Sequence, residues 1–237
     1  MTEAESLPTA RSVLRAFTDF LRRPALLAPQ GLRTAGSRRT WVWLTALLIG
    51  GLLLVLLPVL GAWQKAFALP SPDAFQAVPK QLLVPLVVLV APVLEELLFR
   101  GWQSGRVAAL WLLGCALAVA VVAALGTALN PLVTAGTVLA ALIAAPVGWW
   151  LLRRSAPLGW FARGFPVIFY LVAGGFALAH LSNYSRISLL AVPLVLPQLW
   201  AALVLGYMRQ RLGLLPAILA HALANGCSLG LAVLAGG

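Results

Sequence analysis

The sequence predicts an all-α, polytopic membrane protein with about seven transmembrane helices and a basic amphipathic segment at its amino terminus. Hydrophobic residues make up 62% of the 237 residues and charged residues only 10%, whereas about half of a soluble domain is apolar. The apolar residues also form seven stretches of roughly 20 residues, the length that crosses the hydrocarbon core of a bilayer. An ordinary soluble domain is therefore excluded.

The net charge of +11 raises the question of an acidic partner, and nucleic acid is the first candidate. A nucleic-acid-binding protein gathers lysine and arginine on one water-exposed face. In this chain the basic residues lie between the apolar stretches instead, where they set membrane topology and contact anionic lipid headgroups. We therefore expect membrane lipids, and no nucleic acid, among the partners.

The first 40 residues form a basic segment that precedes the first apolar stretch. Apolar side chains recur in it at spacings of three and four, as in an amphipathic helix that lies on a membrane surface. A partly disordered arm is the alternative interpretation. A cleavable signal peptide is not expected, because the segment lacks a continuous apolar core. The apolar residues are Val13, Leu14, Phe17, Phe20 and Leu21, and the basic ones are Arg11, Arg15, Arg22, Arg23, Arg33, Arg38 and Arg39.

The remainder, residues 41–237, is expected to be one transmembrane domain of seven spans. A cytoplasmic amino terminus would place only Lys65, Lys80 and Arg186 in the outer loops, and the other fourteen of the seventeen basic residues inside. Because cytoplasmic loops are enriched in lysine and arginine, we predict this orientation in the plasma (inner) membrane. The predicted spans are Trp41–Trp63, Gln81–Gln103, Val107–Leu129, Pro131–Leu152, Phe165–Leu181, Ser188–Met208 and Gly213–Ala235.

Two acids and two histidines lie inside the predicted spans. Glu95 and Glu96 are adjacent, and His180 and His221 are the only two histidines of the chain. An ionised carboxylate at the centre of a bilayer costs roughly 2.5 kcal/mol or more on insertion scales, so an acid in this position indicates a functional site. These four groups are the first candidates for the chemistry of the protein.

The spacing around the two glutamates predicts different roles for them. On a helix Glu96 and Arg100 share a face, whereas Glu95 points about 100° away. Arg100 can hold Glu96 in an ion pair, which leaves Glu95 to take up a proton from water. One turn earlier, Pro92 lacks an N–H and leaves the carbonyl of Val88 without its helical partner. A bent helix beside a water-accessible cavity and an ordinary membrane-helix proline both fit this feature.

Two further pairs of residues have the same spacing of four. Phe176 precedes His180, so its ring can wall one side of a pocket around the imidazole. His221 precedes Asn225, and both can donate hydrogen bonds to a developing oxyanion, or His221 can bind a metal with the amide behind it. Each feature alone has another interpretation, because a single histidine is often structural and a pair of glutamates can serve a proton relay or an ion site.

The order of these motifs resembles the CAAX-processing and bacteriocin-processing (CPBP) family of intramembrane proteases, also called the abortive-infection family. The resemblance implies that Glu95 and His180 activate the attacking water and that His221 and Asn225 stabilise the tetrahedral oxyanion. It leaves open whether a divalent metal such as zinc is held by Glu95, His180 and His221, or whether glutamate activates the water without metal. The matching motifs are Glu-Glu-x-x-x-Arg at Glu95, Glu96 and Arg100, Phe-x-x-x-His at Phe176 and His180, and His-x-x-x-Asn at His221 and Asn225.

The chain departs from this family pattern between its first two motifs. Family members usually place the Phe-x-x-x-His helix soon after the first motif, whereas here two spans at about 107–152 intervene. An inserted hairpin explains the difference, because two spans return the chain to the same side of the membrane. The motif helices are then expected at about 81–103, 165–184 and 213–235.

The depth of the three motifs in the membrane gives a test of the prediction. Glu95 and His221 lie in the cytoplasmic halves of their predicted spans, but His180 lies near the outer end of its span. If the fifth helix starts late and continues through Ser185, His180 moves toward the middle.

Three functions are compatible with these observations. The first is an intramembrane endopeptidase, open toward the cytoplasm, that cleaves near the membrane surface in CAAX-type or leader-peptide processing; its substrate would be a peptide or a lipidated protein. The second is a non-catalytic membrane scaffold or immunity protein of the same fold, although none of the motif residues is missing. The third is a proton-coupled transporter that uses Glu95 and His180 as relay groups, although no inverted repeat is visible.

Overall fold

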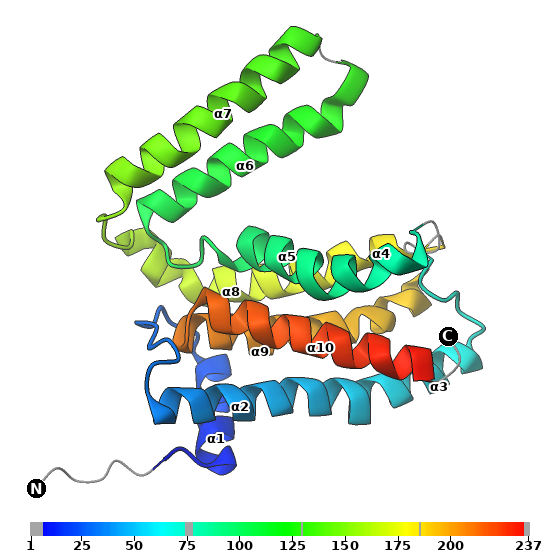
Figure 1. Cartoon of the computed structure of the whole chain (residues 1–237). Coiled ribbons are helices and arrows are strands. Elements are labelled where there is room, and N and C mark those ends of the chain that lie inside the picture. Colours follow the sequence, from blue (N-terminus) through cyan, green and yellow to red (C-terminus); the bar gives the residue numbers. More distant parts are fainter. Residues whose placement is uncertain (1–6, 74–77, 129, 185, 235–237) are drawn as a thin grey trace, which may run out of the picture. The chain divides into compact units, whose positions relative to one another are not determined.

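The computed structural model describes residues 7–73, 78–128, 130–184 and 186–234. The described residues form helices and no strand, and seven helical segments are long and apolar enough to cross a membrane (Figure 1). The predicted all-α, seven-span class is therefore confirmed. The seven segments are Ala35–Ala66, Gln81–Arg100, Val107–Leu125, Pro131–Leu152, Gly159–Asn183, Leu189–Arg211 and Leu214–Leu234.

The boundaries of several spans differ from the predicted ones. The first span starts at Ala35, because Thr34 caps the helix with its side chain and Ser37 completes a capping box. The helical backbone thus extends beyond the apolar run that composition alone detects. The fifth span likewise begins at Gly159, well before its apolar core. Leu129 and Ala235, the predicted last residues of two spans, lie outside the described residues.

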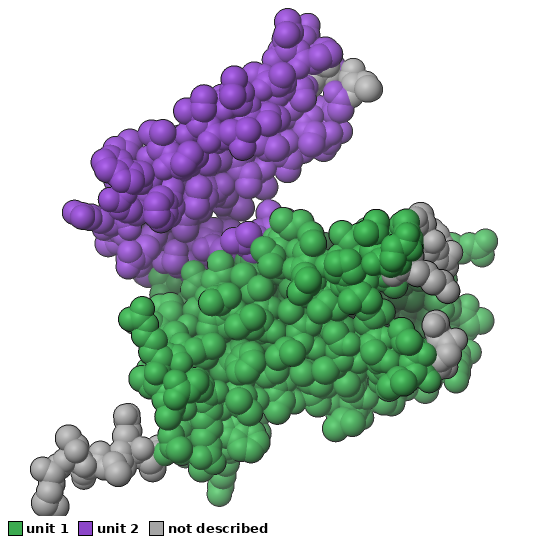
Figure 2. All heavy atoms as spheres, viewed as in Figure 1, with its two compact units in different colours: residues 1–96, 165–237 green, residues 97–164 purple. Residues whose placement is uncertain are grey.

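The chain divides into two compact units, which Figure 2 colours separately. Unit 1 comprises residues 1–96 and 165–237, and unit 2 comprises residues 97–164. Two helices, α5 (Ala91–Arg100) and α8 (Gly159–Ala179), cross from one unit into the other. The site described below lies in unit 1.

Helices α2, α9 and α10 pack beside one another in unit 1. A Cβ atom at Gly51 would lie 2.5 Å from Nε1 of Trp200, so only glycine lets that indole donate its hydrogen bond to the carbonyl of Leu48 at 3.1 Å. The helices of unit 1 are α1 (Ala10–Arg22), α2 (Ala35–Gly50), η1 (Gly51–Leu56), α3 (Leu57–Ala66), α4 (Lys80–Val84), η2 (Pro85–Val90), η4 (His180–Asn183), η5 (Leu189–Val195), α9 (Leu196–Arg211) and α10 (Leu214–Leu234), together with parts of α5 and α8.

In the described part of the amino-terminal segment, residues Ala10–Arg22 form an amphipathic helix, α1. Its apolar face contacts protein. Val13, Phe17 and Phe20 are buried, and the rings of Phe17 and Phe20 both contact Tyr207 of α9, with centroids 5.6 and 4.9 Å apart. The sequence pattern could not distinguish a lipid surface from this aromatic one, because both bury the same helical face.

The connection between α1 and α2 is tied to the turn between α9 and α10. The amide of Gln30 donates to the carbonyl of Arg211 at 3.1 Å, and that of Gly31 donates to the carbonyl of Leu212 at 3.0 Å. Gly31 has a φ of 65°, a conformation that favours glycine. The basic segment is thus packed into unit 1.

Unit 2 contains a helical hairpin of α6 (Val107–Leu125) and α7 (Pro131–Leu152), with the short helix η3 (Gly126–Ala128) after α6. Nε1 of Trp111 donates to the carbonyl of Ala144 at 2.9 Å, and a Cβ atom at Gly148 would lie 2.1 Å from that nitrogen. The two spans therefore pack closely on each other at the predicted hairpin.

Candidate active site

A π-helical turn, η2, directly precedes α5, the helix that carries Glu95 and Glu96. The amide of Ala91 donates to the carbonyl of Leu86, five residues earlier. In this register the carbonyl of Val87 faces Pro92, which has no N–H to donate. The amide group of Asn225 donates to Val87 instead, at 2.9 Å. The carbonyl that Pro92 cannot serve is therefore that of Val87, one residue earlier than expected, because the turn is π and not α.

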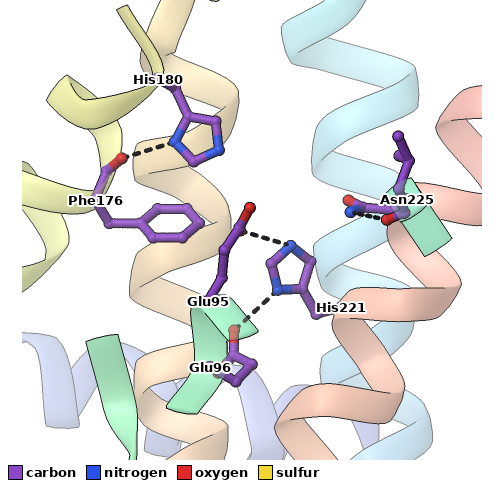
Figure 3. Close-up of polar contacts among 7 residues, drawn as sticks. Glu95, Glu96, Phe176, His180, His221 and Asn225 are labelled. Atoms are coloured by element: carbon purple, nitrogen blue, oxygen red, sulfur yellow. Dashed lines mark hydrogen bonds and ion pairs between the residues drawn. The ribbon is translucent and has the colours of Figure 1, made fainter. Parts of the chain in front are cut away.

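His221 lies between the two adjacent glutamates, as Figure 3 shows. Its Nδ1 is 2.9 Å from Oε1 of Glu96, and its Nε2 is 3.7 Å from Oε2 of Glu95. Glu96 is fully buried, whereas 27% of the Glu95 side chain is exposed. Glu96 thus orients the imidazole, and Glu95 remains accessible on its other side. Sequence spacing could not show this contact, because it joins helices more than a hundred residues apart.

Arg100 lies on α5 one turn after Glu96, as the motif predicts. Its side chain is buried, with 1% of the residue exposed. A buried guanidinium needs compensating acceptors, which agrees with a role in holding the acidic motif. The ion pair between Arg100 and Glu96 stays a prediction.

His180 lies where the α-helix gives way to a 3₁₀ turn. Helix α8 begins at Gly159 and ends at Ala179, and η4 continues through Asn183. The fifth helix therefore does not start late, and Ser185, its expected end in that case, lies outside the described residues. Nδ1 of His180 is 2.8 Å from the carbonyl of Phe176. If Nδ1 donates this hydrogen bond, Nε2 is left as an acceptor.

Phe176 is the aromatic wall between the two histidines. Its ring centroid lies 4.7 Å from that of His180 and 6.2 Å from that of His221. The phenyl ring is buried, so it excludes water from one side of both imidazoles. The predicted pocket wall is therefore present, and it serves both histidine motifs.

One cavity of about 470 Å³ brings the motif residues together within unit 1. Glu95, His180, His221 and Asn225 line it, and Glu96 and Arg100 do not. Most of the remaining lining is apolar, which suits a substrate with apolar side chains or a lipid group. Three polar lining residues that sequence reasoning missed are Asn183, Gln198 and Ser228.

The cavity extends to the end of unit 1 where Pro72 and Asn183 line it. That end carries the loop after α3 and the turn after α8. In the predicted orientation it faces away from the cytoplasm, so the expected cytoplasmic opening does not match this lining. Tyr184, which directly follows Asn183, lies outside the spans, and burial raises the pKa of its phenol.

Glu95, His180 and His221 are the ligands of the metal-dependent alternative, and in the described part of the chain they are not arranged as a cluster that fits a metal ion. No three histidine, cysteine, aspartate or glutamate side chains are gathered there closely enough to hold an ion. In addition, Nδ1 of His180 and both nitrogens of His221 already face oxygen atoms of the protein. The donor set as arranged does not fit a metal held by three protein ligands.

Comparison with known proteins gives one family match. The family model described as type II CAAX prenyl endopeptidase Rce1-like matches residues 77–156 and 148–227, which together cover more than half of the chain. The first segment contains Glu95 and Glu96, and the second contains His180, His221 and Asn225. No curated protein and no solved structure matches the chain.

Proposed function

Because the chain belongs to the Rce1-like family of type II CAAX prenyl endopeptidases, we propose that it is an intramembrane endopeptidase that hydrolyses a peptide bond near the membrane surface. The observation that carries the proposal is that Glu95, His180, His221 and Asn225, from three different spans, line one cavity. A structural histidine or a pair of surface acids would not require this convergence. Its mainly apolar lining supports a peptide or lipidated-protein substrate.

The attacking water is activated by Glu95 and His180. The Glu95 carboxylate accepts one proton of the water, and Nε2 of His180 accepts a hydrogen bond from the other, since its Nδ1 is engaged by the Phe176 carbonyl. The water oxygen attacks the scissile carbonyl, which becomes a tetrahedral oxyanion. Collapse of this intermediate breaks the C–N bond, and protonated Glu95 returns its proton to the leaving amine.

The oxyanion is stabilised by His221 and Asn225. Glu96 accepts a hydrogen bond from Nδ1 of His221, which fixes the ring with Nε2 on the Glu95 side. When Nε2 carries a proton, it donates a hydrogen bond to the oxyanion. Asn225 uses one N–H for the Val87 carbonyl. An amide nitrogen has two, so the second remains to donate to the oxyanion. A fixed donor of this kind needs no reorganisation during the reaction.

The proposal assigns the water activation to protein side chains and routes no step through a metal. The reason is the donor arrangement described above. Elemental analysis of the active, purified protein tests this part separately. One bound zinc per active chain, with activity lost on its removal, would replace it with metal-assisted hydrolysis.

The activity is tested by incubating the purified full chain with a farnesylated CAAX peptide and, separately, with a leader peptide. Mass spectrometry then identifies any cleavage product and its cut site. Cleavage of the farnesylated peptide within its CAAX sequence supports CAAX-type processing, and cleavage of the leader peptide supports leader processing. A protein that folds and cleaves neither, nor any lipidated protein of its own membrane, supports the scaffold alternative.

We also propose that the amino terminus is cytoplasmic and that the protein resides in the plasma (inner) membrane. The basis is the excess of basic residues in the inner segments. Reporter fusions after Pro70, Leu158 and Gly237 are expected to give a cytoplasmic signal at Leu158 alone. A cytoplasmic signal at Gly237 would contradict the orientation, and with it the side from which a substrate reaches the Pro72 end of the cavity.

A further inference from the structure

Gln198 is a polar lining residue of the cavity that the hydrolytic mechanism does not use. It lies in the first turn of α9, directly after Pro197, and shares the cavity lining with Glu95 and His221. Its carboxamide oxygen is buried and has no hydrogen-bond partner among the residues that the structure describes. Gln198 thus lines a mainly apolar site and carries a buried carboxamide oxygen that no described residue satisfies.

Two other amides of unit 1 show how such groups are normally satisfied. Asn225 donates to the carbonyl of Val87 at 2.9 Å, and Oε1 of Gln210 accepts the amide of Leu27 at 3.4 Å. Most buried polar side chains have at least one such partner. An acceptor that lacks one is destabilising, so Gln198 is a poor choice for a residue that only fills space.

The chemistry of the carboxamide indicates which ligand would satisfy it. A glutamine side chain offers an acceptor and a donor in one plane, and an extended peptide presents the complementary N–H and C=O groups along its backbone. The end of the glutamine side chain rotates in a broad, roughly twofold profile, so either atom can turn toward the cavity. Being uncharged, Gln198 would hold the peptide without selecting for charged side chains.

We propose that Gln198 is a substrate-binding residue whose carboxamide pairs with the backbone of an extended peptide in the cavity beside Glu95. The inference rests on the proposed endopeptidase function and adds a residue that positions the peptide chain. The contact is made equally in the ground state and the transition state, because the Gln198 amide does not touch the reacting atoms. It therefore acts on substrate binding and not on the chemical step.

The first test compares Gln198→Met, an apolar side chain of similar length, with Gln81→Met, a matched change at an exposed glutamine outside the cavity. With the farnesylated CAAX peptide as probe, Gln198→Met is expected to raise KM about 5-fold to 10-fold with kcat within about twofold, as for one lost hydrogen bond. Gln81→Met should leave both constants unchanged. An unchanged KM in Gln198→Met, or an equal effect of Gln81→Met, would overturn the proposal.

The second test removes the hydrogen bond from the side of the peptide. Ester analogues of the same probe, each with one backbone N–H near the scissile bond replaced by oxygen, are compared on both enzymes. One ester position should weaken binding to the wild type about 5-fold and have no further effect on Gln198→Met, because the partner is already gone. Additive effects at every position would overturn the inference, and this comparison does not depend on how well the variant folds.

Binding to Glu95→Gln separates this inference from the proposed function. If the wild type cleaves the probe while Gln198→Met binds it equally well, the endopeptidase stands and the role of Gln198 is refuted. If no probe is cleaved but its binding to Glu95→Gln is weakened when Gln198→Met is added, the endopeptidase fails and the role of Gln198 in peptide binding stands.

Discussion

The two units contain spans of similar apolarity but use them differently. In unit 1, Glu96 and His221 are buried among helices from distant parts of the chain, and five motif residues line the cavity. In unit 2, no residue of α7 is buried, and Leu142 is 68% exposed. High hydropathy therefore marks a membrane span but does not distinguish a span that builds a site from one that faces lipid.

The hairpin of α6 and α7 therefore has different packing requirements from the motif helices. Its apolar side chains need only lipid around them, and its internal order comes from close contacts such as that between Trp111 and Gly148. Unit 1 instead must satisfy buried carboxylates and imidazoles with one another. We expect substitutions in unit 1 to affect activity or stability strongly, and substitutions on the lipid-facing hairpin to have little effect.

Apart from changes at Glu95, the largest effect on turnover is expected for Asn225→Ala. Loss of one oxyanion donor typically lowers turnover about 100-fold to 1000-fold, with little change in substrate affinity or metal content. Single-turnover cleavage measures this directly. Because Asn225 also satisfies the Val87 carbonyl, thermal unfolding is measured alongside. Near-normal turnover would show that the residue only supports the π turn.

The next effect concerns stability. Arg100→Ala removes the buried cation that is predicted to pair with Glu96 and should cost about 3 kcal/mol, seen as a lower yield and a lower unfolding temperature in detergent. Glu95→Gln serves as the control and should keep the wild-type unfolding temperature. Equal stability of Arg100→Ala and the control would remove Arg100 from the structural role that its spacing predicts.

The smallest effect tests the hairpin. Leu142→Ala is expected to change the free energy of unfolding by no more than about 0.5 kcal/mol and to leave cleavage unchanged. Its matched control is Leu205→Ala on α9, where the side chain is fully buried and truncation should cost about 2 to 5 kcal/mol. If the two variants behaved alike, the contrast between the units would not hold.

Local pattern was enough to predict much of this molecule. Periodicity and length gave the seven spans and α1, and spacings of four residues predicted the pairing of Phe176 with His180 on one wall of the cavity. What local pattern could not give were contacts between distant helices. The contact of Glu96 with Nδ1 of His221 was not expected, and only the packing of α10 against the first motif helix creates it.

Changes of helix type were likewise not predictable from the sequence. Pro92 signalled a free carbonyl, but the π register moved it from Val88 to Val87. The 3₁₀ turn at His180 has no clear signal in an apolar run. Gln198 was detectable by the rule that singled out the glutamates, since it is a polar residue inside an apolar span. Burying an amide there costs less free energy than burying a charge, so Gln198 was not identified as a candidate.

The central claim is that Glu95 activates water for peptide hydrolysis in the unit 1 cavity. The most direct test is cleavage of the probe peptide by purified Glu95→Gln beside the wild type, under conditions where both are folded. We predict that Glu95→Gln binds the peptide as tightly as the wild type and does not cleave it, because an amide cannot accept the proton of the water. Cleavage at the wild-type rate by Glu95→Gln would contradict the account.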